Sequence, residues 1–138
     1  MDEIKTGDII LIENFISQGS PVSRHSFVVI EDKNGQLCSL DYDFIALLMS
    51  SFKDKEQKEK KLKYPGNFPI SASSEDVKDG HKKEGYIKAE QFYYFSKSNT
   101  TYKVIGELKK DTLDSLMDFI EGFPKKHIEI EQIIDNLK

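Results

Sequence analysis

The 138-residue chain has few of the residues that cross-link proteins or bind metals. It contains one cysteine, Cys38, which has no partner in the chain for a disulfide bond. Because Cys38 lies among apolar neighbours such as Leu37 and Leu40, we expect it to be a small buried side chain. One cysteine and three histidines form no zinc-binding pattern, so the sequence predicts neither a metal site nor a cofactor.

Long hydrophobic runs are also missing. No apolar run is long enough to cross a bilayer, and the first residues, Met1 to Lys5, do not form a signal peptide. We therefore expect a cytoplasmic protein that does not bind membranes. The 38% apolar and 32% charged residues are ordinary for a soluble protein, and a length of 138 residues suits one domain with one core.

Positive charges are outnumbered by negative ones overall but are concentrated locally. The net charge of −4 argues against a nucleic-acid partner, because phosphate binding depends on lysine and arginine. However, residues 53–63 contain six lysines against three acidic residues, and His81 begins a second basic cluster. The alternative is a solvated charged surface, which is the usual meaning of such runs. The candidates for contacts with an RNA backbone are Lys53, Lys55, Lys82 and Lys83.

Short apolar runs predict several strands. Strands are expected at residues 9–12, 26–30, 37–40, 44–49, 68–70, 85–95 and 101–108. For 44–49 the composition allows helix or strand, and we favour strand. Asn34-Gly35 predicts a hairpin turn between the second and third strands.

Helical periodicity is found near the C-terminus. A helix beginning at Asp111 has apolar residues at helical spacing and is ended by Gly122 and Pro124. A second helix is expected over about residues 129–137, while residues 52–63 form either a short charged helix or a loop that becomes ordered on binding. The sequence thus predicts an α+β fold that is mainly β, a small β-barrel with C-terminal helices. The apolar side of the last helix would consist of Ile130, Ile133, Ile134 and Leu137.

Two cationic side chains precede the strand at 26–30. Arg24 is permanently charged, and His25 can gain or lose a proton near neutral pH. The buried strand Phe27 to Ile30 would hold both side chains in a fixed place. The alternative is structural, with the arginine at a strand end and the histidine packed against the barrel.

The strand at 85–95 carries a second pair of charged side chains. Ile87 and Ala89 fall on one face, and Tyr86, Lys88 and Glu90 fall on the other. Side chains two residues apart on one face lie about 7 Å apart, so Lys88 and Glu90 can serve one substrate group. The alternative is an exposed ion pair, which contributes little to stability.

Four motifs follow one another along the chain in the order that is typical of a known protein family. They are a Gly-Asp before the first strand (Lys5 to Ile12), a basic residue before an apolar strand (Ser23 to Ile30), a strand ending in two hydroxyl residues (Ile45 to Ser51), and an acidic residue followed by glutamine (Lys82 to Gln91). A strand at 104–108 and a helix from Asp111 come after them. Over about residues 4–121, this order resembles the PemK/MazF family of toxins from bacterial type II toxin–antitoxin systems.

The resemblance implies a fold, an activity and partners. The fold would be an SH3-like barrel of the PemK/MazF/CcdB kind over residues 1–122, followed by a helical extension at 123–138. The protein would be a homodimer and a metal-independent, sequence-selective endoribonuclease that cuts single-stranded RNA, and an antitoxin protein would neutralise it. Two features depart from the family: the proline usual after the arginine is missing, and residues 52–70 are long and lysine-rich. Arg24 and His25 are therefore both candidates for the catalytic cation.

RNA can be cleaved without a metal because its own 2′-hydroxyl attacks the neighbouring phosphate. The protein must then supply a base, an acid for the leaving 5′-oxygen, and donors to the phosphate. Glu90 is a candidate base, and His25 is suited to proton exchange near neutral pH. The candidates for binding the phosphate are Arg24, Lys88, Ser50 and Ser51. The alternative function is a non-catalytic barrel that binds RNA or a protein target.

Overall fold

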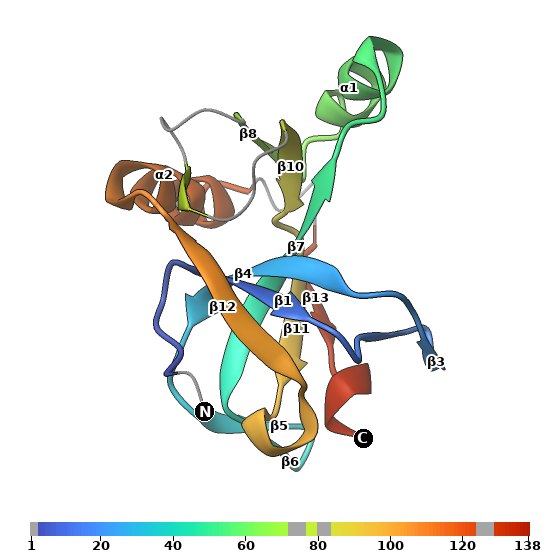
Figure 1. The fold of residues 1–138 in the computed structure, drawn as a ribbon, viewed down its shortest axis with the longest axis vertical. Helices are drawn as coiled ribbons and strands as arrows, with labels where there is room; N and C mark the ends of the chain where they lie inside the picture. Colours follow the sequence, from blue (N-terminus) through green and yellow to red (C-terminus); the bar gives the residue numbers. More distant parts are fainter. Residues whose placement is uncertain (1–2, 72–76, 80–83, 124–128) are drawn as a thin grey trace.

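The computed structural model describes residues 3–71, 77–79, 84–123 and 129–138 (Figure 1). This part of the chain has an α+β fold that is mainly β, as predicted. The strands are β1 (Asp8–Ile12), β2 (Ile16–Ser17), β3 (Ser20–Pro21), β4 (His25–Glu31), β5 (Gly35–Leu37), β6 (Leu40–Tyr42), β7 (Phe44–Ser51), β8 (Asn67–Ile70), β9 (Val77–Asp79), β10 (Gly85–Lys88), β11 (Gln91–Phe95), β12 (Tyr102–Leu108) and β13 (Glu131–Ile133). The α-helices are α1 (Lys55–Leu62) and α2 (Lys110–Glu121), and 3-10 turns lie at Lys97–Asn99 and Asp135–Leu137.

One large sheet contains most of the strands. Its order is β13-β11-β7-β4-β1-β12-β9, and β10 and β8 extend it beside the far end of β7. All neighbours in it are antiparallel except β11 and β13. In the described residues this order does not close into a barrel. Figure 1 shows α1 projecting from the end of β7 that lies opposite the β5–β6 hairpin.

Both faces of the central strands are buried. On one face Val28 and Leu47 pack with Leu116 of α2 in a first core. On the other face Phe27 packs with Phe15 and further apolar side chains in a second core. Strands buried on both sides are continuous apolar runs rather than alternating ones, which explains the sequences of β4 and β7. The strand prediction for residues 44–49 is confirmed.

The predicted hairpin turn at Asn34-Gly35 is wrong. β5 pairs with β6 with Leu37 opposite Leu40, so Cys38 and Ser39 form the two-residue turn. Their φ angles of 54° and 64° are those of a type I′ turn. Gly35 has a different role, since a Cβ on it would lie 2.5 Å from the Tyr42 hydroxyl. The expected burial of Cys38 is also wrong: the thiol is exposed because this turn is at the surface.

The helix expected over residues 129–137 is not present. The chain instead forms β13, parallel to β11, and a 3-10 turn. Ile133 packs against the second core, whereas Leu137 belongs to the first. The spacing of the isoleucines is compatible with a segment whose side chains pack into two cores and also with a helix that has one apolar face. Pairing with β11 selects the first arrangement.

The helices follow the sequence more closely. α2 begins one residue before Asp111 and ends at Gly122, as predicted. For residues 52–63 the sequence allows a short helix or a loop, and the structure has the helix α1 there. Neither α-helix of the described part combines the length and the apolar sequence needed to cross a bilayer.

Candidate functional site

Three of the predicted site residues lie on the same side of the sheet. β4 pairs with β7 from Phe27, which is opposite Leu48, and His25, two residues before Phe27, is opposite Ile12 of β1. Ser50 is opposite Tyr86 of β10. Lys88 follows Tyr86 by two residues and therefore shares its face. Phe27 and Leu48 belong to the second core, and alternation along β4 and β7 places His25 and Ser50 on their side of the sheet. His25, Ser50 and Lys88 therefore all lie on the second-core side, and we call them the polar edge.

A bulge brings Glu90 to the same edge. The strand predicted at 85–95 is interrupted: Ile87 is opposite Met49 but Tyr93 is opposite Ala46, so the β10–β11 side has three more residues than β7. Ala89 and Phe92 both pack against the first core. The two residues between them therefore both lie on the other side, with Lys88 and Tyr93. The expected shared face of Lys88 and Glu90 fits this arrangement.

Glu90 is held in an apolar environment. It is 9% exposed, and its Oε2 is buried without a hydrogen-bond partner. Burial raises the pKa of this carboxyl group, and Glu131 adds to the increase. The backbone N–H of Glu90 and the nearby Lys88 oppose it. The carboxyl group therefore keeps its proton to a higher pH than an exposed glutamate, which suits proton exchange with a substrate.

His25 is fixed by its neighbours. Its Nδ1 hydrogen-bonds to the Ser23 carbonyl oxygen, which can only accept, so Nδ1 carries the proton. In the neutral ring Nε2 is then the acceptor. The ring of Phe15 contacts the imidazole edge-on, with centroids 5.5 Å apart. His25 is half-buried at the start of β4, and it presents a defined nitrogen to proton chemistry.

The other candidates lie apart from this edge. Arg24 is exposed and precedes β4, while Ser51 is exposed and points to the opposite face of β7 from Ser50. Lys53 and Lys55 are exposed beside and within α1. Lys82 and Lys83 lie outside the described residues.

A further set of hydrogen-bonded polar side chains, which the sequence did not predict, lies next to the polar edge. The Tyr93 hydroxyl donates to Gln91 Oε1 at 3.0 Å, and Gln91 Nε2 donates to Glu131 at 3.4 Å. Burial and the carboxylates of Glu131, Glu90 and Asp135 raise the pKa of Tyr93 to about 12, so it remains a hydroxyl donor. The glutamine after the acidic residue was part of the quoted motif, but its contact with Glu131 depends on β13 and has no local sequence signal.

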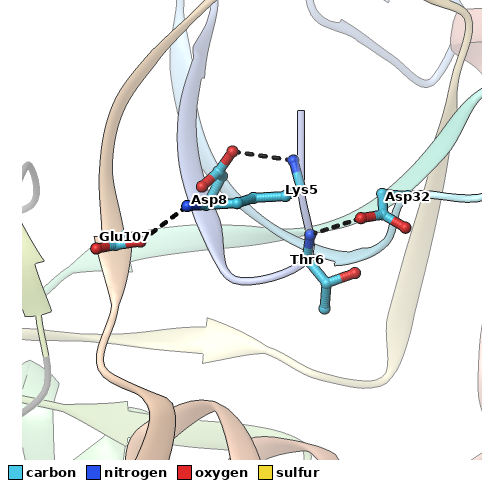
Figure 2. A network of polar contacts seen from close by, with 5 residues as sticks. All are labelled: Lys5, Thr6, Asp8, Asp32 and Glu107. Atoms are coloured by element: carbon cyan, nitrogen blue, oxygen red, sulfur yellow. Dashed lines mark hydrogen bonds and ion pairs between the residues drawn. The ribbon is translucent and has the colours of Figure 1, made fainter. Parts of the chain in front are cut away.

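A second polar group lies elsewhere, at the turn before β1. Asp8 accepts a bond from the Lys5 backbone N–H, Asp32 accepts one from Thr6, and Lys5 pairs with Glu107 (Figure 2). Burial raises the pKa of Asp8 against the effect of that backbone bond. Every carboxylate in Figure 2 thus has a partner that fixes the turn, which indicates a structural role.

Two open cavities adjoin this turn. One of about 700 Å³ is lined by residues that include Lys5, Asp8 and Glu107, and one of about 550 Å³ lies between Thr6 and the start of α2. Neither contains a predicted site residue. Within the described ranges, no three histidine, cysteine, aspartate or glutamate side chains are arranged to hold a metal ion.

The chain has no match among protein-family models, among curated proteins or among solved structures. The resemblance to the PemK/MazF toxins therefore depends on the motifs quoted above and stays a prediction.

Proposed function

We propose that this protein is a metal-independent, sequence-selective endoribonuclease that cleaves single-stranded RNA by attack of the 2′-hydroxyl. The observation that carries the proposal is the position of Lys88 near the buried Glu90 carboxyl group, on the side of the sheet that also holds His25 and Ser50. A base, a hydroxyl, a cation and a carboxyl group with a raised pKa are the groups that this reaction needs.

The proposed roles follow from the environments. The Nε2 atom of His25 takes the proton of the 2′-hydroxyl, because Nδ1 is bound to the Ser23 carbonyl. Glu90 donates a proton to the leaving 5′-oxygen, since burial favours its protonated form. Lys88 and Ser50 donate to the phosphate oxygens. The products are a 2′,3′-cyclic phosphate and a 5′-hydroxyl.

The proposal extends to the fold and the partners that the resemblance implies. The curved sheet would be an open form of an SH3-like barrel, acting in the cytoplasm as a homodimeric toxin that an antitoxin protein neutralises. The buried aromatic side chains of the second core support a barrel-like interior.

A test uses purified protein, a long RNA and excess EDTA, followed by mapping of the 5′ ends. Discrete cuts at a recurring short sequence are expected, and they should be lost when Arg24 and His25 are both changed to alanine. Absence of cuts from folded wild-type protein contradicts the nuclease proposal.

One observation favours a second function, a non-catalytic barrel that binds RNA or a protein. The Oε2 atom of Glu90 is buried and out of contact with solvent, and Arg24 and Ser51 do not join the polar edge. RNA binding without cleavage supports this second function.

A further inference from the structure

The turn between α1 and β8 lies directly on the Glu90 carboxylate. The Gly66 carbonyl accepts a hydrogen bond from Ala89 N–H at 3.0 Å. A Cβ built on Gly66 would be 2.5 Å from Glu90 Oε2 and 2.8 Å from the Tyr64 ring. Gly66 does not have a positive φ, so its backbone conformation is open to any residue. Glycine is required here because the carboxylate approaches so closely.

The same turn is tied to the C-terminal end of α1. Asn67 Nδ2 donates to the Lys61 carbonyl at 2.8 Å, and the Tyr64 N–H donates to the same oxygen at 3.2 Å. The Asn67 N–H donates to the Tyr64 carbonyl at 3.1 Å. A displacement of α1 is therefore transmitted to Gly66.

α1 itself is held mainly by its own capping bonds. Asp54 accepts from the Gln57 N–H at 2.7 Å, and Gln57 Oε1 accepts from the Lys53 N–H at 2.6 Å, a reciprocal cap. None of its eight residues is buried, and an ion pair joins Lys58 to Glu84 before β10. A helix this short with so little burial opens at low free energy.

The surface of α1 suits a phosphate backbone. Lys60 and Lys63 are exposed at its C-terminal end, next to the turn, and Lys53 and Lys55 are exposed at its start. The ring of Tyr64, 48% exposed, lies over Gly66 and offers a stacking surface for a base.

We propose that residues 55–67 form a lid on Glu90, in which Gly66 is the positioning residue and the lysines of α1 are the phosphate contacts that open it. In the closed form the turn excludes Glu90 Oε2 from solvent and from substrate. A bound single strand draws α1 and the turn away. The carboxyl group, which the closed form keeps protonated, then becomes a stronger acid and gives its proton to the leaving oxygen. This inference rests on the proposed nuclease function, because the lid would determine when the substrate can reach Glu90.

The experiment follows the titration of the Glu90 side chain by carbon-13 NMR. The probe is a single-stranded DNA oligonucleotide, which has no 2′-hydroxyl and cannot be cleaved by this chemistry. Saturating oligonucleotide should lower the Glu90 pKa toward that of an exposed glutamate. Gly66→Ala should lower it without any oligonucleotide, because the added methyl group pushes the turn away.

Two matched controls separate a lid from a general disturbance. Gly35→Ala introduces the same 2.5 Å contact, but against Tyr42 at the other end of β7, and should leave the Glu90 titration unchanged (Figure 1). Lys60→Gln/Lys63→Gln should weaken oligonucleotide binding about tenfold. At an oligonucleotide concentration that half-saturates the wild-type protein, this double variant should show a much smaller Glu90 shift.

The outcomes separate the lid from the nuclease. If the protein cleaves RNA but Glu90 titrates identically with and without the oligonucleotide, the lid is wrong and the nuclease function stands. If the protein does not cleave RNA but the oligonucleotide lowers the Glu90 pKa, the lid is supported and the nuclease function is wrong. If Gly66→Ala does not fold, the oligonucleotide titration of the wild-type protein decides the matter.

Discussion

A buried carboxylate oxygen without a hydrogen-bond partner costs free energy, and Glu90 contains one. The buried position of the Glu90 side chain depends on three backbone contacts rather than on the sequence pattern around it. Gly66 covers the side chain, Ala89 is bonded to the Gly66 carbonyl, and the Glu90 carbonyl accepts from Glu131 at 2.8 Å. A residue placed in this way at a cost in stability is a candidate for function.

Glu90→Gln should make the protein more stable at pH 7 by about 1 kcal/mol, because it removes a charge from an unsatisfied buried site. The pKa of Glu90 is raised by folding, so its contribution is fully favourable below the unfolded pKa and is lost as the pH rises through the folded value. Urea unfolding at pH 4 and pH 7 measures the difference. The advantage of the variant should be present at pH 7 and absent at pH 4, and an equal advantage at both contradicts the argument.

His25→Ala should lower RNA cleavage in EDTA about 10²- to 10⁴-fold, the usual contribution of a general base. Arg24→Ala should lower it less than tenfold, since Arg24 is exposed and precedes β4. Initial cleavage rates of the two single variants measure this. His25→Gln is the control for lost packing against Phe15, and it should be as inactive as the alanine variant. Activity that depends on Arg24 and not on His25 reverses the assignment.

At the scale of elements, runs of apolar residues were sufficient to predict β1, β4, β7 and β12. Local sequence did not determine where strands break or pair. The interruption after Lys88 arises because β7, the Gly66 turn and β13 all bond to one stretch of chain. Asn34-Gly35 has the stronger local turn preference, yet the pairing of β5 with β6 puts the turn at Cys38. Pairing over long separations outweighs local preference in each case.

The candidate site, too, could be predicted from local sequence only in part. Alternation along a continuous strand predicted that Lys88 and Glu90 share a side. The strand ends at Lys88, and Glu90 lies in the following turn, close enough for Lys88 to lower its pKa. The separation of Ser50 from Ser51 also follows from alternation, although the two residues belong to one motif of the resemblance. The burial of Glu90 could not be foreseen, because the residues that cause it are Gly66 and its turn, more than twenty positions earlier.

The C-terminal segment is held by an asparagine. Asn136 is 8% exposed, its Oδ1 accepts from the Ile16 N–H at 2.8 Å, and its Nδ2 donates to the Ile16 carbonyl at 3.1 Å. Asn136→Ala should lower the free energy of unfolding by about 2 kcal/mol, because two buried backbone groups lose their partners. Chemical denaturation measures the change.

Asn14→Ala is the matched control for Asn136→Ala. Asn14 makes the same two kinds of bond, to the Asn99 carbonyl at 2.9 Å and from the Thr101 N–H at 2.8 Å, but at an exposed site. Water can replace these bonds, so the loss should be less than about 1 kcal/mol. Equal losses in the two variants would mean that burial does not increase the contribution of the Asn136 hydrogen bonds.

For the whole molecule, the distribution of charge matters more than its total. The net charge is −4, yet residues 53–63 carry six lysines against three acids and project from the sheet on α1 (Figure 1). An acidic protein repels RNA except where such a segment presents positive charge. Under the proposed nuclease function, this segment would direct the strand toward the end of β7, where Ser50 and Lys88 lie. The proposed RNA-binding lysines and the proposed catalytic residues would then be close in space, although they belong to different parts of the chain.

This asymmetry predicts how binding to single-stranded RNA responds to salt. If Lys60 and Lys63 each contact a phosphate, Lys60→Gln/Lys63→Gln should reduce the slope of log affinity against log salt by about 1.4, at about 0.7 per contact. Lys109→Gln/Lys110→Gln changes the net charge by the same amount at two exposed residues at the start of α2, and it should leave the slope unchanged. Fluorescence anisotropy with a labelled oligonucleotide at several salt concentrations measures both. Equal reductions in the two variants would mean that total charge, and not the position of α1, governs binding. A reduction confined to the α1 variant identifies the helix as the surface along which the strand approaches Glu90.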